Sequence, residues 1–139
     1  MMRHKIAIVN DEASLMMLLR YNLETKYSLH LYDNTYDALE LLDRPVDLVF
    51  LDASNYPLSG IELFQILRRE TTMPIVFLSA WAWSVREELQ RKGLPAADGY
   101  INLPFAIPDL MVEIEKRLSV SMAAPKCLHP GPRARPLTR

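Results

Sequence analysis

Three short, uninterrupted apolar runs limit what this chain can fold into more than any other feature of its sequence. They are Ile6–Val9, Leu48–Leu51 and Ile75–Leu78, and each is rich in β-branched or large apolar side chains. Apolar runs of this length, without alternating polar residues, are typical of strands buried on both faces of a parallel sheet. Two weaker strands are expected around Ser28–Tyr32 and Gly99–Ile101.

Longer stretches with helical spacing separate the predicted strands. The first helix is expected from about Ser14 to Lys26, with an inward face formed by Leu15, Leu18, Leu19 and Leu23. The second covers roughly Thr35–Leu42, and Asn34 stands before it as a suitable N-cap.

Three further helices have start or stop signals of their own. Ser59 and Glu62 form a capping box at the start of the third, and Ser84 and Glu87 repeat this spacing for a fourth that should stop at Gly93. The last helix carries Pro108 in its first turn and points Ile107, Leu110, Met111, Ile114 and Leu118 inward. Five repeats of strand and helix predict an α/β sandwich around a parallel sheet.

The length and composition of the chain exclude several other classes of protein. The 139 residues are half apolar, which fits one compact domain and excludes disorder throughout. The single cysteine, Cys127, excludes a disulfide framework and a cysteine-based zinc cluster. No apolar run approaches the roughly 18 residues of a membrane span, and the start of the chain is too short for a signal peptide. We therefore expect a cytoplasmic protein without membrane contact.

The formal net charge of −1 is the sum of two very different parts. Residues 1–120 carry 12 basic and 17 acidic side chains, whereas residues 121–139 carry four basic side chains, no acidic ones and four of the ten prolines. Proline removes backbone donors and restricts φ, so no regular element is expected in that segment. We predict a domain over 1–120 followed by a flexible basic, proline-rich tail over 121–139. The tail is either unselected or a contact arm for an acidic partner or for nucleic acid.

Polar side chains follow four of the predicted strands, at the point where each strand ends. Asn10–Glu12 follows the first strand, Asp52 the third, Ser79 the fourth and Asn102–Phe105 the fifth. In an open parallel sheet these ends share one edge, where ligands bind. Two carboxylates suit Mg²⁺, and a carboxylate beside that metal can be phosphorylated. The alternative is that each acidic residue only caps the helix that follows it.

Residues 4–120 resemble the receiver domain of two-component response regulators. The resemblance rests on the acidic loop after Ile6–Val9, on Asp47–Asp52 followed eight residues later by Gly60, on Pro74–Ala80, and on Gly99–Phe105. It implies a flavodoxin-like fold with five parallel strands in the order 2-1-3-4-5. It also implies a role in phosphorelay signal transduction, with a sensor histidine kinase or a phosphotransfer protein as the phosphoryl donor.

The resemblance assigns roles to individual residues. Asp52 matches the phosphoacceptor, and Asp11, Asp52 and the backbone carbonyl of Ser54 match the positions that hold Mg²⁺. Ser79 matches the switch hydroxyl, and Tyr100 matches the aromatic residue whose rotamer follows that hydroxyl. A cis peptide bond is expected between Leu103 and Pro104.

The sequence departs from the receiver pattern at three positions. Asn10 replaces the first acid of the loop and weakens metal binding, Leu103 replaces the usual lysine, and Pro57 stands one position later than the proline of the family. A lysine at the phosphoryl group would contribute about 1.5–3 kcal/mol per hydrogen bond. Two hypotheses remain: an atypical receiver that is phosphorylated on Asp52, and a pseudo-receiver that acts as a binding or scaffold module without phosphorylation.

The output of such a chain is expected to be a protein–protein contact. Trp81 and Trp83 follow the fourth strand and either form a docking surface or cover the end of the sheet. The family docks partners and forms dimers through a face that corresponds here to residues 84–119, so a downstream protein target or a homodimer is expected there. The glycines form no phosphate-binding loop, which excludes a dinucleotide-binding or P-loop enzyme. No other set of residues predicts turnover of a substrate, so no enzymatic activity is expected. We also expect no attached effector domain and no direct DNA binding.

Overall fold

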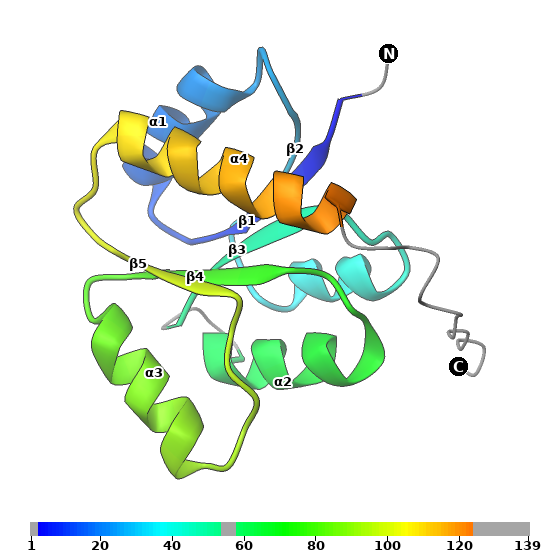
Figure 1. The fold of residues 1–139 in the computed structure, drawn as a ribbon, viewed down its shortest axis with the longest axis vertical. Helices are drawn as coiled ribbons and strands as arrows, with labels where there is room; N and C mark the ends of the chain where they lie inside the picture. Colours follow the sequence, from blue (N-terminus) through cyan, green and yellow to red (C-terminus); the bar gives the residue numbers. More distant parts are fainter. Residues whose placement is uncertain (1–2, 54–57, 124–139) are drawn as a thin grey trace.

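The computed structural model describes residues 3–53 and 58–123 of the chain. Strands and helices alternate along the whole described part (Figure 1). In chain order the elements are β1 (Lys5–Val9), α1 (Ala13–Leu23), β2 (Ser28–Tyr32), the 3₁₀ helix η1 (Asp37–Leu42), β3 (Leu48–Asp52), α2 (Gly60–Glu70), β4 (Ile75–Ser79), α3 (Ala82–Arg91), β5 (Gly99–Asn102) and α4 (Ile107–Ala123).

The five strands form one parallel sheet in the order β2-β1-β3-β4-β5, which confirms the predicted flavodoxin-like topology. The apolar run of β3 lies opposite β1 on one side and β4 on the other, with Val49 beside Ala7 and Ile75. All five residues of β4 are buried. This burial explains why the central strands show continuous apolar runs instead of alternation.

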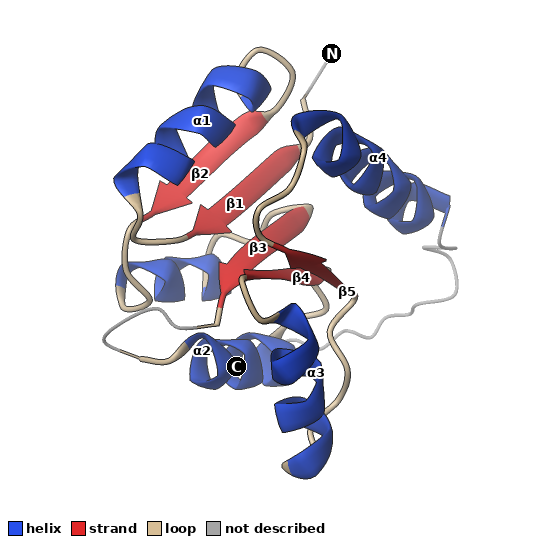
Figure 2. Ribbon diagram, turned by 90° about the vertical axis from the view of Figure 1, so that its left-hand side faces the viewer, coloured by secondary structure: helices blue, strands red, loops and turns tan. Residues whose placement is uncertain are grey.

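Helices cover both faces of the sheet and produce three layers (Figures 1 and 2). Helices α1 and α4 pack on one face around Leu48 and Phe50, whereas α2, α3 and η1 pack on the other around Val49 and Leu51. Successive residues of a strand point to opposite faces, so one strand supplies both cores. The described part contains no helix that is long and apolar enough to cross a membrane.

Helix α1 is shorter than predicted, and one residue of its expected inward face points outward. Leu19 and Leu23 are buried, but Leu18 is 45% exposed. Residues four positions apart lie on one helix face, and Leu18 is a neighbour of this stripe rather than a member. The helix ends at Leu23, three residues before the predicted Lys26.

The predicted helix over 35–42 is a 3₁₀ helix that begins at Asp37. Thr35 is fully buried, and its hydroxyl donates to the carbonyl of Leu58 at 2.9 Å and accepts from the Leu58 N–H at 2.8 Å. This contact holds Thr35 outside the helix. The N-cap residue of η1 is Tyr36, so the predicted N-cap at Asn34 is wrong, although Asn34 Oδ1 accepts from the Asp37 N–H at 2.8 Å.

The capping box of Ser59 and Glu62 is confirmed, with both reciprocal hydrogen bonds present. The second predicted box, at Ser84, is wrong, because α3 begins at Ala82 and its N-cap residue is Trp81. The predicted stop at Gly93 is confirmed: Gly93 has a φ of 70°, and its N–H donates to the carbonyl of Gln90. Glycine adopts this left-handed conformation without steric cost.

Helix α4 extends beyond the predicted domain boundary. It ends at Ala123, so the expectation that 121–139 holds no regular element is wrong for the first three residues of that segment. Leu110, Ile114 and Leu118 are buried as predicted, and Met111 is half-buried. Residues 124–139 lie outside the described part of the chain.

Candidate functional site

The four predicted site segments meet at the carboxyl edge of the sheet. The register of the parallel strands sets Asp52 beside Leu78 and Ser79 beside Asn102, and the loop after β1 opens at the same edge. This edge collects the side chains because parallel strands all end on one side. Ser54, the predicted source of a carbonyl ligand, lies outside the described residues.

Asn10 links the loop after β1 to Asp52. Its side chain is buried, with 2% exposed, and its Nδ2 atom donates to Asp52 Oδ2 at 3.4 Å. Its Oδ1 atom accepts from the Glu12 N–H at 2.7 Å. Asn10 therefore presents a donor to the carboxylate, and its carboxamide oxygen is engaged by the backbone of its own loop.

Asp11, after β1, and Asp52, at the end of β3, are the two carboxylates of the predicted site. Asp11 is exposed and Asp52 is half-buried. No group of three or more His, Cys, Asp or Glu side chains arranged to hold a metal occurs among residues 3–53 and 58–123. Two carboxylates completed by water still fit Mg²⁺, which keeps several waters and often binds one or two carboxylates. The NH₂ group that Asn10 directs toward Asp52 is a hydrogen-bond donor and cannot itself be a metal ligand.

A hollow of about 480 Å³ opens beside Asp11. Its apolar wall includes Met16, Met17 and Leu31, and carboxylates from Asp33 and Asp37 join Asp11 around it. Sequence reasoning missed this hollow, because it forms where α1, the end of β2 and η1 meet.

The hydroxyl of Ser79 is held at the start of α3. Ser79 is 8% exposed, and its Oγ atom accepts from the Trp81 N–H at 3.0 Å. The backbone of Leu103 reaches the same residue, because its N–H donates to the Ser79 carbonyl at 2.9 Å. The predicted cis bond between Leu103 and Pro104 is present. Ser79 thus lies at the predicted edge, with its hydroxyl directed into the loop after β4.

The structure does not bring Tyr100 to Ser79. The Tyr100 ring stacks on Phe77 with a centroid distance of 6.2 Å and an interplanar angle of 12°. Its hydroxyl accepts from the Ala97 N–H at 3.1 Å, just before β5 begins. The ring therefore points away from the carboxyl edge of the sheet.

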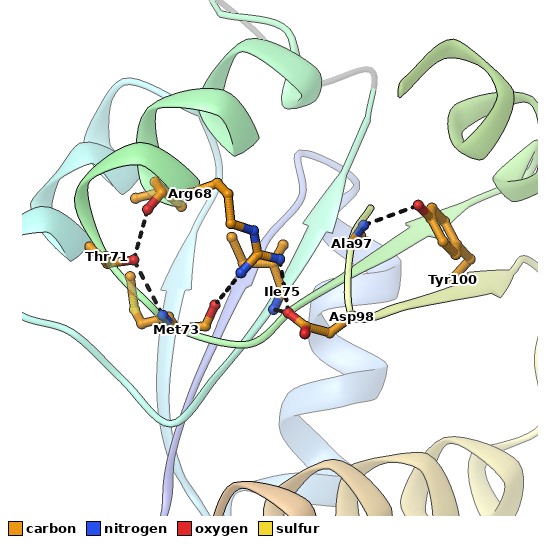
Figure 3. A network of polar contacts seen from close by, with 8 residues as sticks. Arg68, Thr71, Met73, Ile75, Ala97, Asp98 and Tyr100 are labelled. Atoms are coloured by element: carbon orange, nitrogen blue, oxygen red, sulfur yellow. Dashed lines mark hydrogen bonds and ion pairs between the residues drawn. The ribbon is translucent and has the colours of Figure 1, made fainter. Parts of the chain in front are cut away.

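A polar network centred on Arg68 lies at the amino ends of the strands, next to the segment that holds the Tyr100 hydroxyl (Figure 3). Arg68 donates to the carbonyl of Met73 at 3.2 Å and to Asp98 Oδ2 at 2.9 Å. The same Asp98 oxygen accepts from the Ile75 N–H at 2.8 Å. The network joins α2, the start of β4 and the segment that carries Ala97. Sequence reasoning missed it, since its members are up to 30 residues apart.

Both tryptophans after β4 are exposed. Trp81 is 73% exposed and Trp83 is 65% exposed, whereas Ala82 between them is buried. The alternative in which a tryptophan covers the end of the sheet is therefore wrong.

Comparison with known proteins matches this arrangement to a family. The sequence model of the response regulator receiver domain matches residues 6–115. The chain is 40% identical to the phosphate regulon transcriptional regulatory protein PhoB of Rhizobium meliloti over an aligned length of 121 residues, and the match covers 82% of this chain and 52% of PhoB. It is 32% identical to the nisin biosynthesis regulatory protein NisR of Lactococcus lactis over an aligned length of 120 residues, and the match covers 84% of this chain and 51% of NisR. The chain spans about half the length of these relatives.

Solved structures agree with the sequence relatives. The response regulator TrrA of Thermotoga maritima, in complex with Mg²⁺-BeF, has a TM-score of 0.72 and 29% identity, covering 83% of this chain and 99% of TrrA. A CheY-like receiver domain from Methanospirillum hungatei shares the fold, with a TM-score of 0.76 and 20% identity, covering 86% of this chain and 97% of its own. The chain belongs to the response regulator receiver domain family of two-component signalling.

Proposed function

We propose that this chain is an atypical receiver that accepts a phosphoryl group on Asp52 from a sensor histidine kinase or a phosphotransfer protein. The observation that carries the proposal is the half-buried Asp52 carboxylate at the carboxyl end of the central strand β3. Ser79, at the end of the neighbouring strand, supplies the candidate switch hydroxyl.

The transfer would use an oxygen of Asp52 as the nucleophile. The new P–O bond forms while the P–N bond of a phosphohistidine breaks, and the imidazole leaves with the electron pair and takes up a proton. When bound, Mg²⁺ would neutralise the charge of the carboxylates and the phosphoryl group. Asp11 and Asp52 would hold it, with the Ser54 carbonyl as the third protein ligand. The receivers to which this chain belongs are signalling modules, and this reaction is a modification of the chain itself.

Two substitutions weaken this chemistry. Leu103 provides no cation for the phosphoryl oxygens, and a hydrogen bond to a charged group contributes about 1.5–3 kcal/mol. Asn10 adds no charge to hold the metal, but its NH₂ group stabilises the resting Asp52 carboxylate. The expected result is a receiver that is phosphorylated slowly.

The output would be a contact with a downstream protein or a second copy of the chain, not direct DNA binding. The surface would include the face of α3, β5 and α4 over residues 84–119, extended by Trp81 and Trp83. Exposed tryptophans support this proposal, because tryptophan is enriched in the energetic centres of protein interfaces.

A second candidate is a binding or scaffold module that does not use phosphorylation. The observation in its favour is that Asn10 already provides Asp52 with a hydrogen-bond donor. Leu103, in turn, supplies no cation to bind a phosphoryl group.

Incubation with acetyl phosphate and Mg²⁺, followed by intact-mass spectrometry, separates the two candidates. The proposal predicts a mass gain of one phosphoryl group that Asp52→Asn removes and that the exposed control Asp43→Asn retains. No gain, under conditions that label an ordinary receiver, would reject phosphorylation and favour the scaffold module. A gain that persists in Asp52→Asn would place the modification elsewhere.

A further inference from the structure

Helix α3 has no side-chain cap of its own. Its N-cap residue is Trp81, which offers no oxygen to the first backbone N–H groups, and Ser84 makes no capping box. The first N–H groups of a helix have no partner within the helix and need one from outside. In this chain the partners come from other elements.

Two strand ends supply the missing caps. Ser79 Oγ at the end of β4 accepts from the Trp81 N–H at 3.0 Å, and Asn102 Oδ1 at the end of β5 accepts from the Ala82 N–H at 3.0 Å. Ser79 and Asn102 are register partners in the sheet, so the two caps lie side by side. The start of α3 is therefore tied to both strands.

Only one of these caps, Ser79, belongs to the candidate site. On the proposed function, the Ser79 hydroxyl rotates toward a phosphoryl group on Asp52. A rotation about χ1 carries Oγ away from the Trp81 N–H and removes that cap. Asn102 makes no contact in the pocket that the structure records, and its hydrogen bond to Ala82 does not depend on the rotation.

We propose that Asn102 is a positioning residue that keeps the first turn of α3 attached to β5, so that the departure of Ser79 displaces Trp81 while Ala82 stays anchored. Ala82 is buried, with 3% exposed, and lies between two exposed tryptophans. This burial is consistent with a residue that keeps its position while Trp81 moves. The capping by Asn102 stands on geometry alone, and the coupling to Ser79 rests on the proposed function.

The chain contains its own reporter for this inference. Trp81 and Trp83 are its only two tryptophans, so tryptophan emission, excited selectively over the six tyrosines, reports on the start of α3. Hydrogen exchange of the Ala82 amide reports on the Asn102 cap directly.

The cap is tested without any phosphoryl donor. Asn102→Ala should raise the exchange rate of the Ala82 amide about fivefold, the amount expected for one lost cap, and should change the tryptophan emission. Asn102→Asp keeps the acceptor oxygen and should restore both readouts. The matched control is Asn22→Ala, because Asn22 donates to a backbone carbonyl of α1, far from α3; it should change neither. Unchanged exchange and emission in a folded Asn102→Ala chain would overturn the proposal.

The coupling is tested with beryllium fluoride and Mg²⁺. The unmodified chain should change its tryptophan emission, Asp52→Asn should not, and Asn102→Ala should show a different amplitude because its anchor is lost. An emission change equal in the unmodified chain and in Asn102→Ala would overturn the coupling. If beryllium fluoride leaves the emission of the unmodified chain unchanged while acetyl phosphate labels Asp52, only the coupling is wrong. If acetyl phosphate does not label Asp52 either, both the coupling and the proposed function are wrong.

Discussion

At the scale of single residues, Asn10 determines the charge of the pocket. Its NH₂ group lies 3.4 Å from Asp52 Oδ2, where a carboxylate would place a negative charge directly beside that of Asp52. Two unit charges about 4 Å apart repel by about 4 kcal/mol at an effective dielectric constant of 20. The amide removes this repulsion, and it also removes part of the attraction for a cation.

Asn10→Asp is therefore expected to make the stability of the chain depend on Mg²⁺. Without the metal the free energy of unfolding should fall, by up to about 4 kcal/mol, because two carboxylates then face each other. Added Mg²⁺ should restore most of the loss. Urea unfolding with a chelator and with Mg²⁺ measures both effects, with Asp11→Asn as the matched control that should reduce the response to the metal. Equal stability under both conditions in Asn10→Asp would contradict this account of the pocket.

The raised pKa of Tyr32 predicts that the folded chain loses stability at alkaline pH. Burial, reinforced by the hydrogen bond that its hydroxyl donates to Glu40 at 2.9 Å, raises the pKa of Tyr32 from 10.0 to about 12. The folded chain thus holds this proton more tightly than the unfolded chain does. The resulting stabilisation is complete below pH 10 and is lost as the pH rises through 12.

Urea unfolding isolates the contribution of Tyr32 to stability when Tyr32→Phe and the unmodified chain are compared at pH values on both sides of this window. The difference between the two chains should shrink as the pH rises from 10 to 12. A difference that stays constant with pH would show that Tyr32 does not titrate as described.

At the scale of elements, Gly60 sets how closely α2 approaches the end of β3. A Cβ atom at this position would overlap the carbonyl oxygen of Asp52 and would lie 2.5 Å from the Cα atom of Ala53. Both are backbone atoms, so a side chain could be accommodated only by moving the strand end that carries Asp52. The glycine that helped to identify the family therefore has a physical reason.

Gly60→Ala should destabilise the chain by about 3 kcal/mol and also slow the labelling of Asp52 by acetyl phosphate. The control is Gly93→Ala, which has open space around its Cβ but a φ of 70°. Gly93→Ala should lower the free energy of unfolding by about 1–2 kcal/mol and leave the labelling of Asp52 unchanged. Normal labelling in a folded Gly60→Ala chain would argue against a tight approach at Asp52.

The Arg68 network joins α2, the start of β4 and the segment before β5, which also carries Ala97, the partner of the Tyr100 hydroxyl. Its ion pair with Asp98 is only partly exposed, at 21% and 40%, whereas the pair of Arg20 and Glu24 on α1 is exposed at 65% and 52%. Less exposed pairs are screened less by solvent and salt. The two pairs therefore allow a matched comparison.

A double-mutant cycle with Arg68→Ala and Asp98→Asn should give a coupling of about 1 kcal/mol, against about 0.3–0.5 kcal/mol for Arg20 and Glu24. The measurement is urea unfolding of the single and double variants. A coupling no larger than that of the α1 pair would show that the network does not stabilise the segment before β5.

At the scale of the whole molecule, the sequence predicts what depends on local pattern. Strand positions, strand order and the capping box at Ser59 follow from short-range signals or from the family resemblance, and the structure confirms them. The start of α3 could not be predicted, because its caps come from Ser79 and Asn102, which are brought together only by the sheet. The outward turn of Leu18 and the hollow beside Asp11 likewise depend on packing between elements.

The candidate site was partly predictable for the same reason. Asp52 and Ser79 lie at strand ends that a parallel sheet must bring to one edge. The contact of Asn10 with Asp52, and the hydrogen bond between the Tyr100 hydroxyl and the Ala97 N–H, depend on partners that the spacing of residues in the sequence does not show. The positions where the chain departs from its family are therefore those where the structure adds most.

The measurement that tests the central claim most directly is the rate at which Asp52 is labelled by acetyl phosphate in the unmodified chain and in Leu103→Lys. We expect slow labelling of the unmodified chain and labelling about ten- to a hundredfold faster in Leu103→Lys, because the lysine restores a charged hydrogen bond of about 1.5–3 kcal/mol. Time courses of intact mass, with Asp52→Asn in each background, give both rates. Absence of labelling in both chains, or labelling that survives Asp52→Asn, would contradict a receiver whose chemistry is centred on Asp52.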